Sequence, residues 1–302
     1  MRIVTIVFLA ALLLCPVSSY AGLADFAIIS LTGSLTAGQN FNVTTSPGNV
    51  GALGNILIGN SGAIAGGAVA RDDSPASTIS LGTSVVSGQC VTAGGSVTGT
   101  CTGGNDTDGV NALITSFDNA VAEAAILGAS LDALTPTDTL AAITNTATIS
   151  SSNTGLVVFD IPSITLGSNE TLTLSGASTD TFVIDTGSIT LGQNSDIALT
   201  GGLLASQVIF HLSTTSISVN SSDLFGTFYI GEAGCSISNS FTLDGALICR
   251  DDISFDENTT INSNPFAGEL PVPIPEPATS LLLGAGLAGL IVLRRRRAGK
   301  TC

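Results

Sequence analysis

The 302-residue chain contains no tryptophan, a single histidine and few charged residues, which make up 10% of its length. An ordinary soluble domain carries about 25% charged residues. Intrinsically disordered segments and coiled coils both depend on abundant charge, so this composition excludes both classes. Histidine is the most frequent general acid or base, and the chain offers only His211 for that role.

Basic residues are equally scarce outside the two ends of the chain. Six of the eight lie close to a terminus: Arg2, Arg294, Arg295, Arg296, Arg297 and Lys300. All 23 acidic residues except Glu276 lie between Gly22 and Ile274, where Arg71 and Arg250 are the only basic residues, so this part carries a net charge of about −20. A surface of this sign repels phosphates, and we expect no nucleic-acid partner.

The first 21 residues have the pattern of a secretory signal peptide. Arg2 supplies the positive start, residues 3–14 form an apolar run, and residues 19–21 end on the small Ala21. We predict residues 1–21 as a signal peptide that is cleaved after Ala21, and therefore an exported protein.

The C-terminal region has a second signal. A proline-rich spacer, residues 269–277, precedes 16 uncharged residues, 278–293, and a block of arginines follows them. A helix of that length spans roughly 24 Å, somewhat less than a ~30 Å hydrocarbon core, and snorkelling arginines can close the difference. We predict a transmembrane segment with an arginine-rich stop over residues 278–297 and a short tail over 298–302, with the preceding chain outside the membrane.

This arrangement resembles the PEP-CTERM sorting signal. The residues that carry the resemblance are Pro275, Glu276, Pro277, the hydrophobic segment, Arg294, Arg295, Arg296 and Arg297. The resemblance implies a Gram-negative bacterial host, an exosortase as processing partner, and attachment to the inner membrane through the C-terminal helix. It also implies that the protein is anchored or released at the cell surface, often in association with exopolysaccharide or biofilm.

Four cysteines remain once both signals are removed: Cys90, Cys101, Cys235 and Cys249. An even number in an exported chain indicates disulfides, and three pairings are possible. We favour Cys90–Cys101 and Cys235–Cys249, because each of these pairs brackets a short Gly- or Ser-rich loop.

No metal or cofactor site is predicted. The cysteines lack the Cys-x-x-Cys spacing of zinc sites, and His211 has no neighbouring histidine. Residues 105–109 resemble the start of a calcium loop, but the remaining acidic ligands are missing. We interpret Asp108 instead as the cap of a helix.

Residues 22–268 form the predicted main domain. Short apolar runs separated by Gly, Ser, Asn and Asp fill residues 23–105 and 143–265, a pattern typical of strands and turns. Between them we predict one amphipathic helix, about 109–134, with one face packed on a sheet. Its apolar residues recur at spacings of three and four: Leu113, Phe117, Val121, Ala124, Leu127, Leu131 and Leu134.

An internal repeat gives the fold class. The segment Ser-Ile-Thr-Leu-Gly at 163–167 recurs at 188–192, 25 residues later, and weaker copies occur at 78–82, 216–220 and 236–239. A period in the twenties made of short strands indicates a solenoid, whose coils bury their apolar faces by stacking. We predict a mainly β protein, an irregular β-solenoid (β-helix) with one long flanking α-helix, besides the signal and transmembrane helices. A β-sandwich with chance similarity in biased sequence is the alternative.

The body of the chain also resembles the bacterial and fungal ice-binding proteins that have an irregular β-solenoid. The resemblance rests on spaced apolar and glycine positions in residues 172–184, 199–210, 225–228 and 243–259, and on the helix at 109–134, where that family inserts one. Choice-of-anchor A domains are similar over residues 153–159 and 264–268.

This resemblance implies a non-catalytic domain that binds ice through a flat face of hydroxyls and methyls. Thr171, Thr173, Thr190 and Thr200 lie in or beside the repeated strands and are the candidate ice or ligand face. The alternative is an adhesin of the extracellular polysaccharide or biofilm matrix that has no ice activity.

A secreted carboxylate-dependent hydrolase is a third and less favoured hypothesis. Asp185-Thr186-Gly187 has the sequence of an aspartic-protease turn, but that chemistry needs two such carboxylates and no second motif exists. We interpret Asp185 as a corner of the solenoid and predict no catalytic residue.

Overall fold

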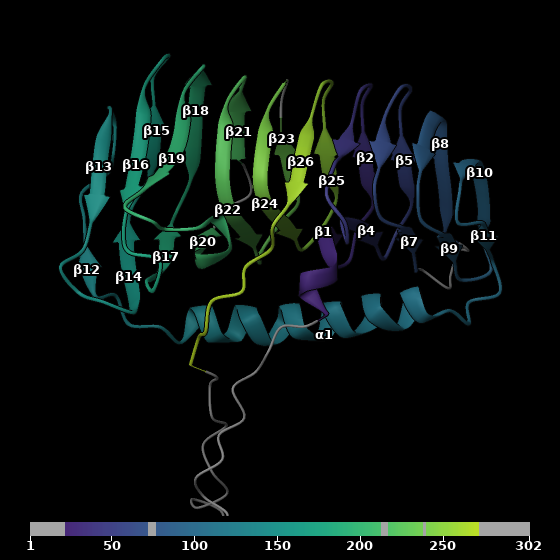
Figure 1. Ribbon diagram of the computed structural model, residues 1–302, viewed down its shortest axis with the longest axis horizontal. Helices are drawn as coiled ribbons and strands as arrows, with labels where there is room; N and C mark the ends of the chain where they lie inside the picture. Colours follow the sequence, from purple (N-terminus) through teal and green to yellow (C-terminus); the bar gives the residue numbers. More distant parts are fainter. Residues whose placement is uncertain (1–21, 72–76, 213–216, 238–239, 272–302) are drawn as a thin grey trace, which may run out of the picture. The chain divides into compact units, whose positions relative to one another are not determined.

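The computed structural model describes residues 22–71, 77–212, 217–237 and 240–271. The chain divides into two units, residues 1–270 and 271–302, and only the first falls largely within the described residues. This unit is a β-solenoid of parallel strands with one long helix, α1, along one side (Figure 1). The predicted fold class is confirmed. The predicted signal and transmembrane helices lie outside the described residues.

Each coil of the solenoid turns through three sides. The helix side lies against α1. Its strands, in spatial order, are β12 (Asp138–Thr139), β14 (Leu156–Ile161), β17 (Thr181–Thr186), β20 (Val208–Leu212), β22 (Asp223–Ile230), β24 (Thr242–Cys249), β1 (Phe26–Ser30), β4 (Asn49–Ala52), β7 (Ala68–Ala70), β9 (Cys90–Thr92) and β11 (Asn105–Asp106).

After the helix side, each coil passes through two further sides, which we call the ladder side and the broad side. The ladder side comprises β15 (Ile164–Leu166), β18 (Ile189–Gln193), β21 (Ile217–Asn220), β23 (Cys235–Ile237), β25 (Ile253–Phe255), β2 (Leu35–Ala37), β5 (Ile56–Ile58), β8 (Thr78–Val86) and β10 (Ser96–Cys101). The broad side comprises β13 (Ala147–Ser150), β16 (Thr171–Ser175), β19 (Asp196–Thr200), β26 (Thr260–Ser263), β3 (Asn42–Val43) and β6 (Ala63–Ile64), together with one half each of β22, β24, β8 and β10. The bend within β22 falls at Gly226, whose φ of 108° favours glycine.

The predicted repeat corresponds to two successive coils. Ile164, Thr165 and Leu166 pair in register with Ile189, Thr190 and Leu191, and Leu172 pairs with Ile197. The 25-residue spacing is therefore the length of one coil, and equivalent side chains stack directly on one another.

The spatial order of the coils differs from their order in the chain. β1 pairs with both β4 and β24, so the first coil lies between the second coil and the last one. From residue 22 the described chain enters the middle of the solenoid, builds outward to β11, crosses along α1, and builds back from β12 until it meets its own first coil (Figure 1). The first coil therefore joins the two halves, because it pairs with the second coil on one side and the last coil on the other.

Inward-facing apolar residues fill the solenoid. Phe41, Phe159, Phe182, Phe210 and Phe228 are all at most 1% exposed. The rings of Phe210 and Phe228 stack with centroids 4.6 Å apart and an interplanar angle of 4°. Offset or stacked aromatic pairs of this kind stabilise by about 0.5–1.5 kcal/mol beyond the area they bury.

Helix α1 (Ala112–Asp132) covers the helix side. Its predicted apolar stripe is confirmed, with Phe117, Leu127 and Leu131 at most 3% exposed. The predicted cap is wrong: Asn111 is the N-cap, accepting a 2.8 Å hydrogen bond from the Leu113 amide. Asp108 instead accepts a hydrogen bond from the Val110 amide, before the helix begins. Among the described residues α1 alone has the length and apolar composition of a membrane span, and here it packs on the solenoid.

Candidate ligand-binding face

The ladder side presents one outward side chain per coil. Seven of the nine strands on this side contain the pattern apolar–exposed–apolar, as in Ile164-Thr165-Leu166 and Ile253-Ser254-Phe255. In β8 the central Ser80 is half-buried, and in β10 the exposed Gly99 follows Thr98. The two apolar side chains point into the core, since successive side chains of a strand face opposite ways. The central residue is left on the surface.

These central residues form a row that we call the hydroxyl ladder. Cα pairing runs from Thr165 through Thr190 to Ser218 in one series. A second series runs from Ser236 through Ser254, Thr36, Leu57 and Ser80 to Thr98. Strands β21 and β23 are in contact where the two series meet. Of these nine positions, only Leu57 lacks a hydroxyl, and within each series neighbouring rungs lie about 4.8 Å apart.

The corner after the ladder side keeps the coils in register. Seven non-glycine residues have positive φ: Asn40, Ser61, Asn169, Asn194, Ser221, Ser240 and Asn258. Asparagine tolerates this left-handed conformation better than most residues do. The Asn40 amide also donates to the Asn258 side-chain oxygen at 2.8 Å, which bonds the first coil to the last.

The four predicted threonines do not share one face. Thr190 belongs to the hydroxyl ladder, whereas Thr171, Thr173 and Thr200 lie on the broad side. Thr171 and Thr173 are half-buried, and toward β19 they pair with Asp196 and Ala198. Hydroxyls continue only in short rows, from Thr148 to Thr173 and from Ser150 through Ser175 to Thr200. The broad side is thus chemically mixed, and the prediction of a common face for these four residues is wrong.

The alternation of residues along each strand could not separate the two sides. Thr173 between two leucines and Thr190 between isoleucine and leucine look alike in sequence. A partial signal is a glycine directly after the apolar–x–apolar triplet. In five of the nine ladder strands it follows Leu166, Leu191, Ala37, Ile58 and Leu81, although a glycine also follows Phe228-Tyr229-Ile230 on the helix side.

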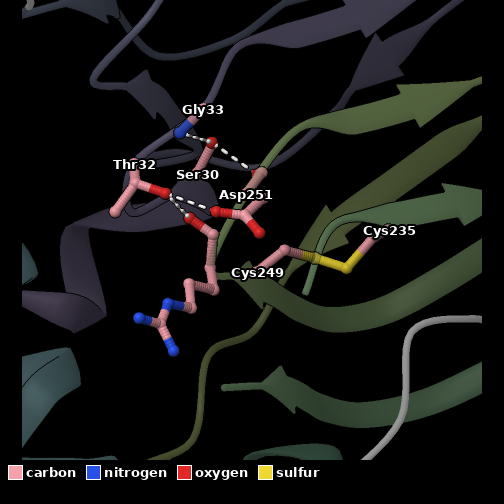
Figure 2. Close-up of a disulfide and its surroundings, with 7 residues drawn as sticks. Ser30, Thr32, Gly33, Cys235, Cys249 and Asp251 are labelled. Atoms are coloured by element: carbon pink, nitrogen blue, oxygen red, sulfur yellow. Dashed lines mark hydrogen bonds between the residues drawn. A yellow bond between two sulfur atoms is a disulfide. The ribbon is translucent and has the colours of Figure 1, made fainter. Parts of the chain in front are cut away.

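The first and last coils, far apart in the sequence, pack side by side and continue the ladder side between them. The Thr32 hydroxyl donates to the carbonyl of Arg250 at 2.8 Å and lies 2.6 Å from Asp251 Oδ1, and the Ser30 hydroxyl donates to the Asp251 carbonyl (Figure 2). The Ser34 amide donates to Asp252 Oδ1 at 2.7 Å. These bonds hold Thr36 in register with Ser254.

Both favoured disulfides are present. Cys235 in β23 is bonded to Cys249 at the end of β24, next to the contact of the first and last coils (Figure 2). Cys90 in β9 is bonded to Cys101 at the end of β10. Each bond ties two sides of the solenoid together.

A shallow cavity of about 280 Å³ lies where α1 ends on the helix side. His211 in β20 has its ring nitrogens 3.6 Å from Asp132 Oδ1 and 3.4 Å from Asp185 Oδ1. Burial raises the pKa of the neighbouring Tyr229, and the charge of Asp132 adds to the effect. The sequence predicts Asp185 at a corner, but this residue lies within β17, in register with Asp160 and His211.

The loop before α1 is an internal hydrogen-bond network. The Asn111 side chain donates to Asp106 Oδ2 at 2.8 Å, and this bond, with a second from the Asp108 amide, lowers the pKa of Asp106. Within the described residues, no three Asp, Glu, His or Cys side chains group as metal ligands.

Comparison with known proteins identifies relatives of both parts of the chain. A family model described as an ice-binding-like adhesive domain matches residues 29–259, and a PEP-CTERM protein-sorting motif matches residues 273–297. The second match includes the predicted sorting residues Pro275 to Pro277 and Arg294 to Arg297, which lie outside the described residues. No curated protein matches the chain.

Solved structures share the fold at low sequence identity. An ice-binding protein from the Antarctic ascomycete Antarctomyces psychrotrophicus is 19% identical, covers 82% of this chain and 99% of its own, and has a TM-score of 0.52. The DUF3494 domain of ice-binding protein 1 from Shewanella frigidimarina is 15% identical, with coverages of 82% and 99% and a TM-score of 0.51. An ice-binding protein from an Antarctic biological consortium is 20% identical, with coverages of 82% and 91% and a TM-score of 0.52.

Proposed function

Because the chain belongs to the ice-binding-like adhesive domain family, a non-enzymatic family, we propose that this exported protein attaches to ice through the hydroxyl ladder. The observation that carries the proposal is the register of the ladder, in which eight hydroxyl-bearing positions out of nine repeat along one side. A single hydroxyl gains little free energy by binding one water molecule, because that molecule gives up equivalent hydrogen bonds to bulk water. A rigid row of hydroxyls at constant spacing can bind many ordered water molecules at once, since the cost of fixing the row was met in folding.

The sorting motif supports the second half of the proposal. A PEP-CTERM motif indicates a cell-surface-associated protein. We propose that an exosortase recognises Pro275, Glu276 and Pro277, and that residues 278–297 hold the chain in the inner membrane of a Gram-negative bacterium until processing. The domain would then be anchored or released at the cell surface.

The test uses purified residues 22–270 and a single ice crystal, whose shape and thermal hysteresis are recorded. Thr190→Tyr places a bulky ring on the ladder, and Thr173→Tyr places the same ring on the broad side. We expect the parent and Thr173→Tyr to facet ice and Thr190→Tyr to lose most of its hysteresis. If Thr173→Tyr loses activity and Thr190→Tyr keeps it, the ladder is not the binding face.

A matrix adhesin without ice activity is the second candidate. Two features favour it: four rungs are serines, which have no methyl group, and Leu57 interrupts the row with an apolar side chain that is 43% exposed. Round, unmodified crystals with every variant, together with binding to extracellular polysaccharide that Thr190→Tyr weakens, would establish this function in place of ice binding.

A further inference from the structure

Both ends of the domain lie against α1. At the start, the backbone amides of Gly22 and Leu23 donate to the Glu123 carboxylate at 2.8 and 3.0 Å. Leu23 is 4% exposed and packs in the apolar cluster between α1 and the helix side. The chain therefore enters the domain on the side that α1 covers.

The chain also leaves the domain on this side. After β26 it runs back across the helix side, where the Phe266 amide donates to the Thr227 hydroxyl and the Ala267 amide to the Ser206 carbonyl, both at 2.8 Å. Phe266 and Leu270 are 4% and 6% exposed and belong to the same apolar cluster as Leu127 and Leu131 of α1. In Figure 1 this yellow segment descends from β26 toward α1.

Little chain separates this exit from the sorting motif. The motif match begins at residue 273, and the uncharged run begins at residue 278. Seven residues, 271–277, separate Leu270 from that run, so the eight Cα–Cα steps between them can span at most about 28 Å even when fully extended. Where residues 278–297 span a membrane, as proposed above, a tether of this length limits how far the chain's exit at Leu270 can lie from the membrane surface.

The exposed face of α1 suits such a position. Ile126 is 43% exposed on it, and Ala122, Ala125 and Ala129 are exposed beside it. Its exposed carboxylates flank this patch: Asp118 pairs with Arg71 at 3.2 Å, and Asp132 ends the helix. By contrast, the corners next to the ladder side carry exposed acidic residues: Asp251, Asp252, Asp256 and Glu257. Anionic lipid headgroups repel those four clustered carboxylates more than they repel the middle of the helix, between Asp118 and Asp132.

We propose that, while residues 278–297 hold the chain in a membrane, the outer face of α1 lies on the bilayer surface and the hydroxyl ladder faces away from it. The proposal rests on the membrane attachment proposed above, and it is independent of ice binding. Because α1 spans about 32 Å along the stacked coils, the solenoid axis then runs parallel to the membrane. All rungs of the hydroxyl ladder then face away from the membrane at the same time.

The absence of tryptophan allows a direct test with the full chain. Ile126→Trp on α1 and Leu57→Trp on the ladder are matched variants, because both parent side chains are 43% exposed. Each variant is inserted into phosphatidylcholine vesicles that contain headgroup spin-labelled lipid, and membrane-bound protein is isolated by flotation. Thermal unfolding of each variant checks that both are folded.

We expect the spin label to quench roughly half of the indole emission of Ile126→Trp and almost none of that of Leu57→Trp, since the quencher is confined to the thin headgroup layer. A long Gly/Ser insertion after Leu270 should reduce the quenching in Ile126→Trp, because the tether then no longer restrains the domain. Equal quenching of both variants, or stronger quenching of Leu57→Trp, overturns the proposed orientation. Failure of the full chain to float with the vesicles overturns the membrane attachment and the orientation with it, and leaves the ice test unaffected.

Discussion

The helix side and the ladder side are built from the same coils, yet one is covered and the other is open. On the helix side, the outward residues under α1 are apolar, as with Ile29, Val69 and Ile248, and they are at most 3% exposed. On the ladder side, the equivalent outward residues are Thr or Ser at every rung but Leu57, and all except the half-buried Ser80 are exposed. The interior that both sides share is equally apolar in each case.

This difference shows that the outward residue of each strand, rather than the core, decides what a side of the solenoid does. Apolar outward residues favour the packing of a helix on that side, because burying them against α1 stabilises the fold by about 25 cal/mol per Å² of apolar surface. Hydroxyl residues contribute little to stability and leave the side free for an external ligand. Mutations on the two sides should therefore separate stability from binding.

The largest effect is expected from breaking the helix side at Phe117. This ring is fully buried, 5.6 Å from the ring of Phe26, and it occupies the space in front of Gly51, where a Cβ atom would clash with it. Phe117→Ala should lower the free energy of unfolding by about 3–5 kcal/mol through lost burial and a cavity. Denaturant-induced unfolding of residues 22–270 measures the change.

Thr165→Ala on the hydroxyl ladder is the matched control. Because Thr165 is exposed and points away from the core, its replacement should change the free energy of unfolding by less than about 0.5 kcal/mol. A loss of several kcal/mol in Thr165→Ala, or a negligible loss in Phe117→Ala, would contradict the division between a stabilising side and a binding side.

The next largest effect is expected from the disulfide that joins the two sides. Cys235 in a ladder strand and Cys249 in a helix-side strand close a loop with a sequence separation of 14. The double variant Cys235→Ala/Cys249→Ala should lose about 3 kcal/mol, mainly because its unfolded chain is less restricted. Unfolding curves with and without reductant give the measurement: the parent should respond to reductant, and the double variant should respond less, through Cys90–Cys101 alone. If the double variant unfolds at the same denaturant midpoint as the parent, the disulfide adds no stability. The hydrogen bonds between Ser30–Ser34 and Arg250–Asp252 would then hold the two coils together without it.

Much of the fold could be predicted because its determinants are local or periodic. The 25-residue repeat predicts which residues stack, and the spacing of Phe117, Leu127 and Leu131 predicts the buried face of α1. The placement of the first coil between the second and the last has no such signal. Its strands have the same apolar–x–apolar pattern as every other coil, so nothing local in residues 35–37 specifies β25 as a neighbour.

The binding face was harder to predict for a related reason. Strand alternation shows which residues point outward, but the corner between two strands determines the side to which they belong. Thr171 and Thr190 both alternate with buried residues, and only the chain path through Asn169 and Asn194 assigns them to different sides. Of the four threonines proposed from sequence, the ladder contains Thr190 alone.

The smallest expected effect concerns Tyr229, where the helix side itself changes character. Along one registered row, apolar Ile29 and Ile248 give way to Tyr229, His211 and Asp185 as α1 ends. Burial and then Asp132 raise the pKa of Tyr229, so the folded protein favours the neutral phenol. The stability gained in this way is fully present below the unfolded pKa of about 10 and is lost as pH rises through the folded value.

Tyr229 is the only tyrosine in residues 22–270, so tyrosinate absorbance reports this site directly. The absorbance midpoint of the folded protein should lie above about 10, whereas the urea-unfolded chain should titrate near 10. Over that range the free energy of unfolding should fall with pH by at most about 1.4 kcal/mol per unit, and Tyr229→Phe should flatten the decline. A midpoint at or below about 10 would mean that α1 does not shield the ring, and that the covered region of the helix side ends before Tyr229.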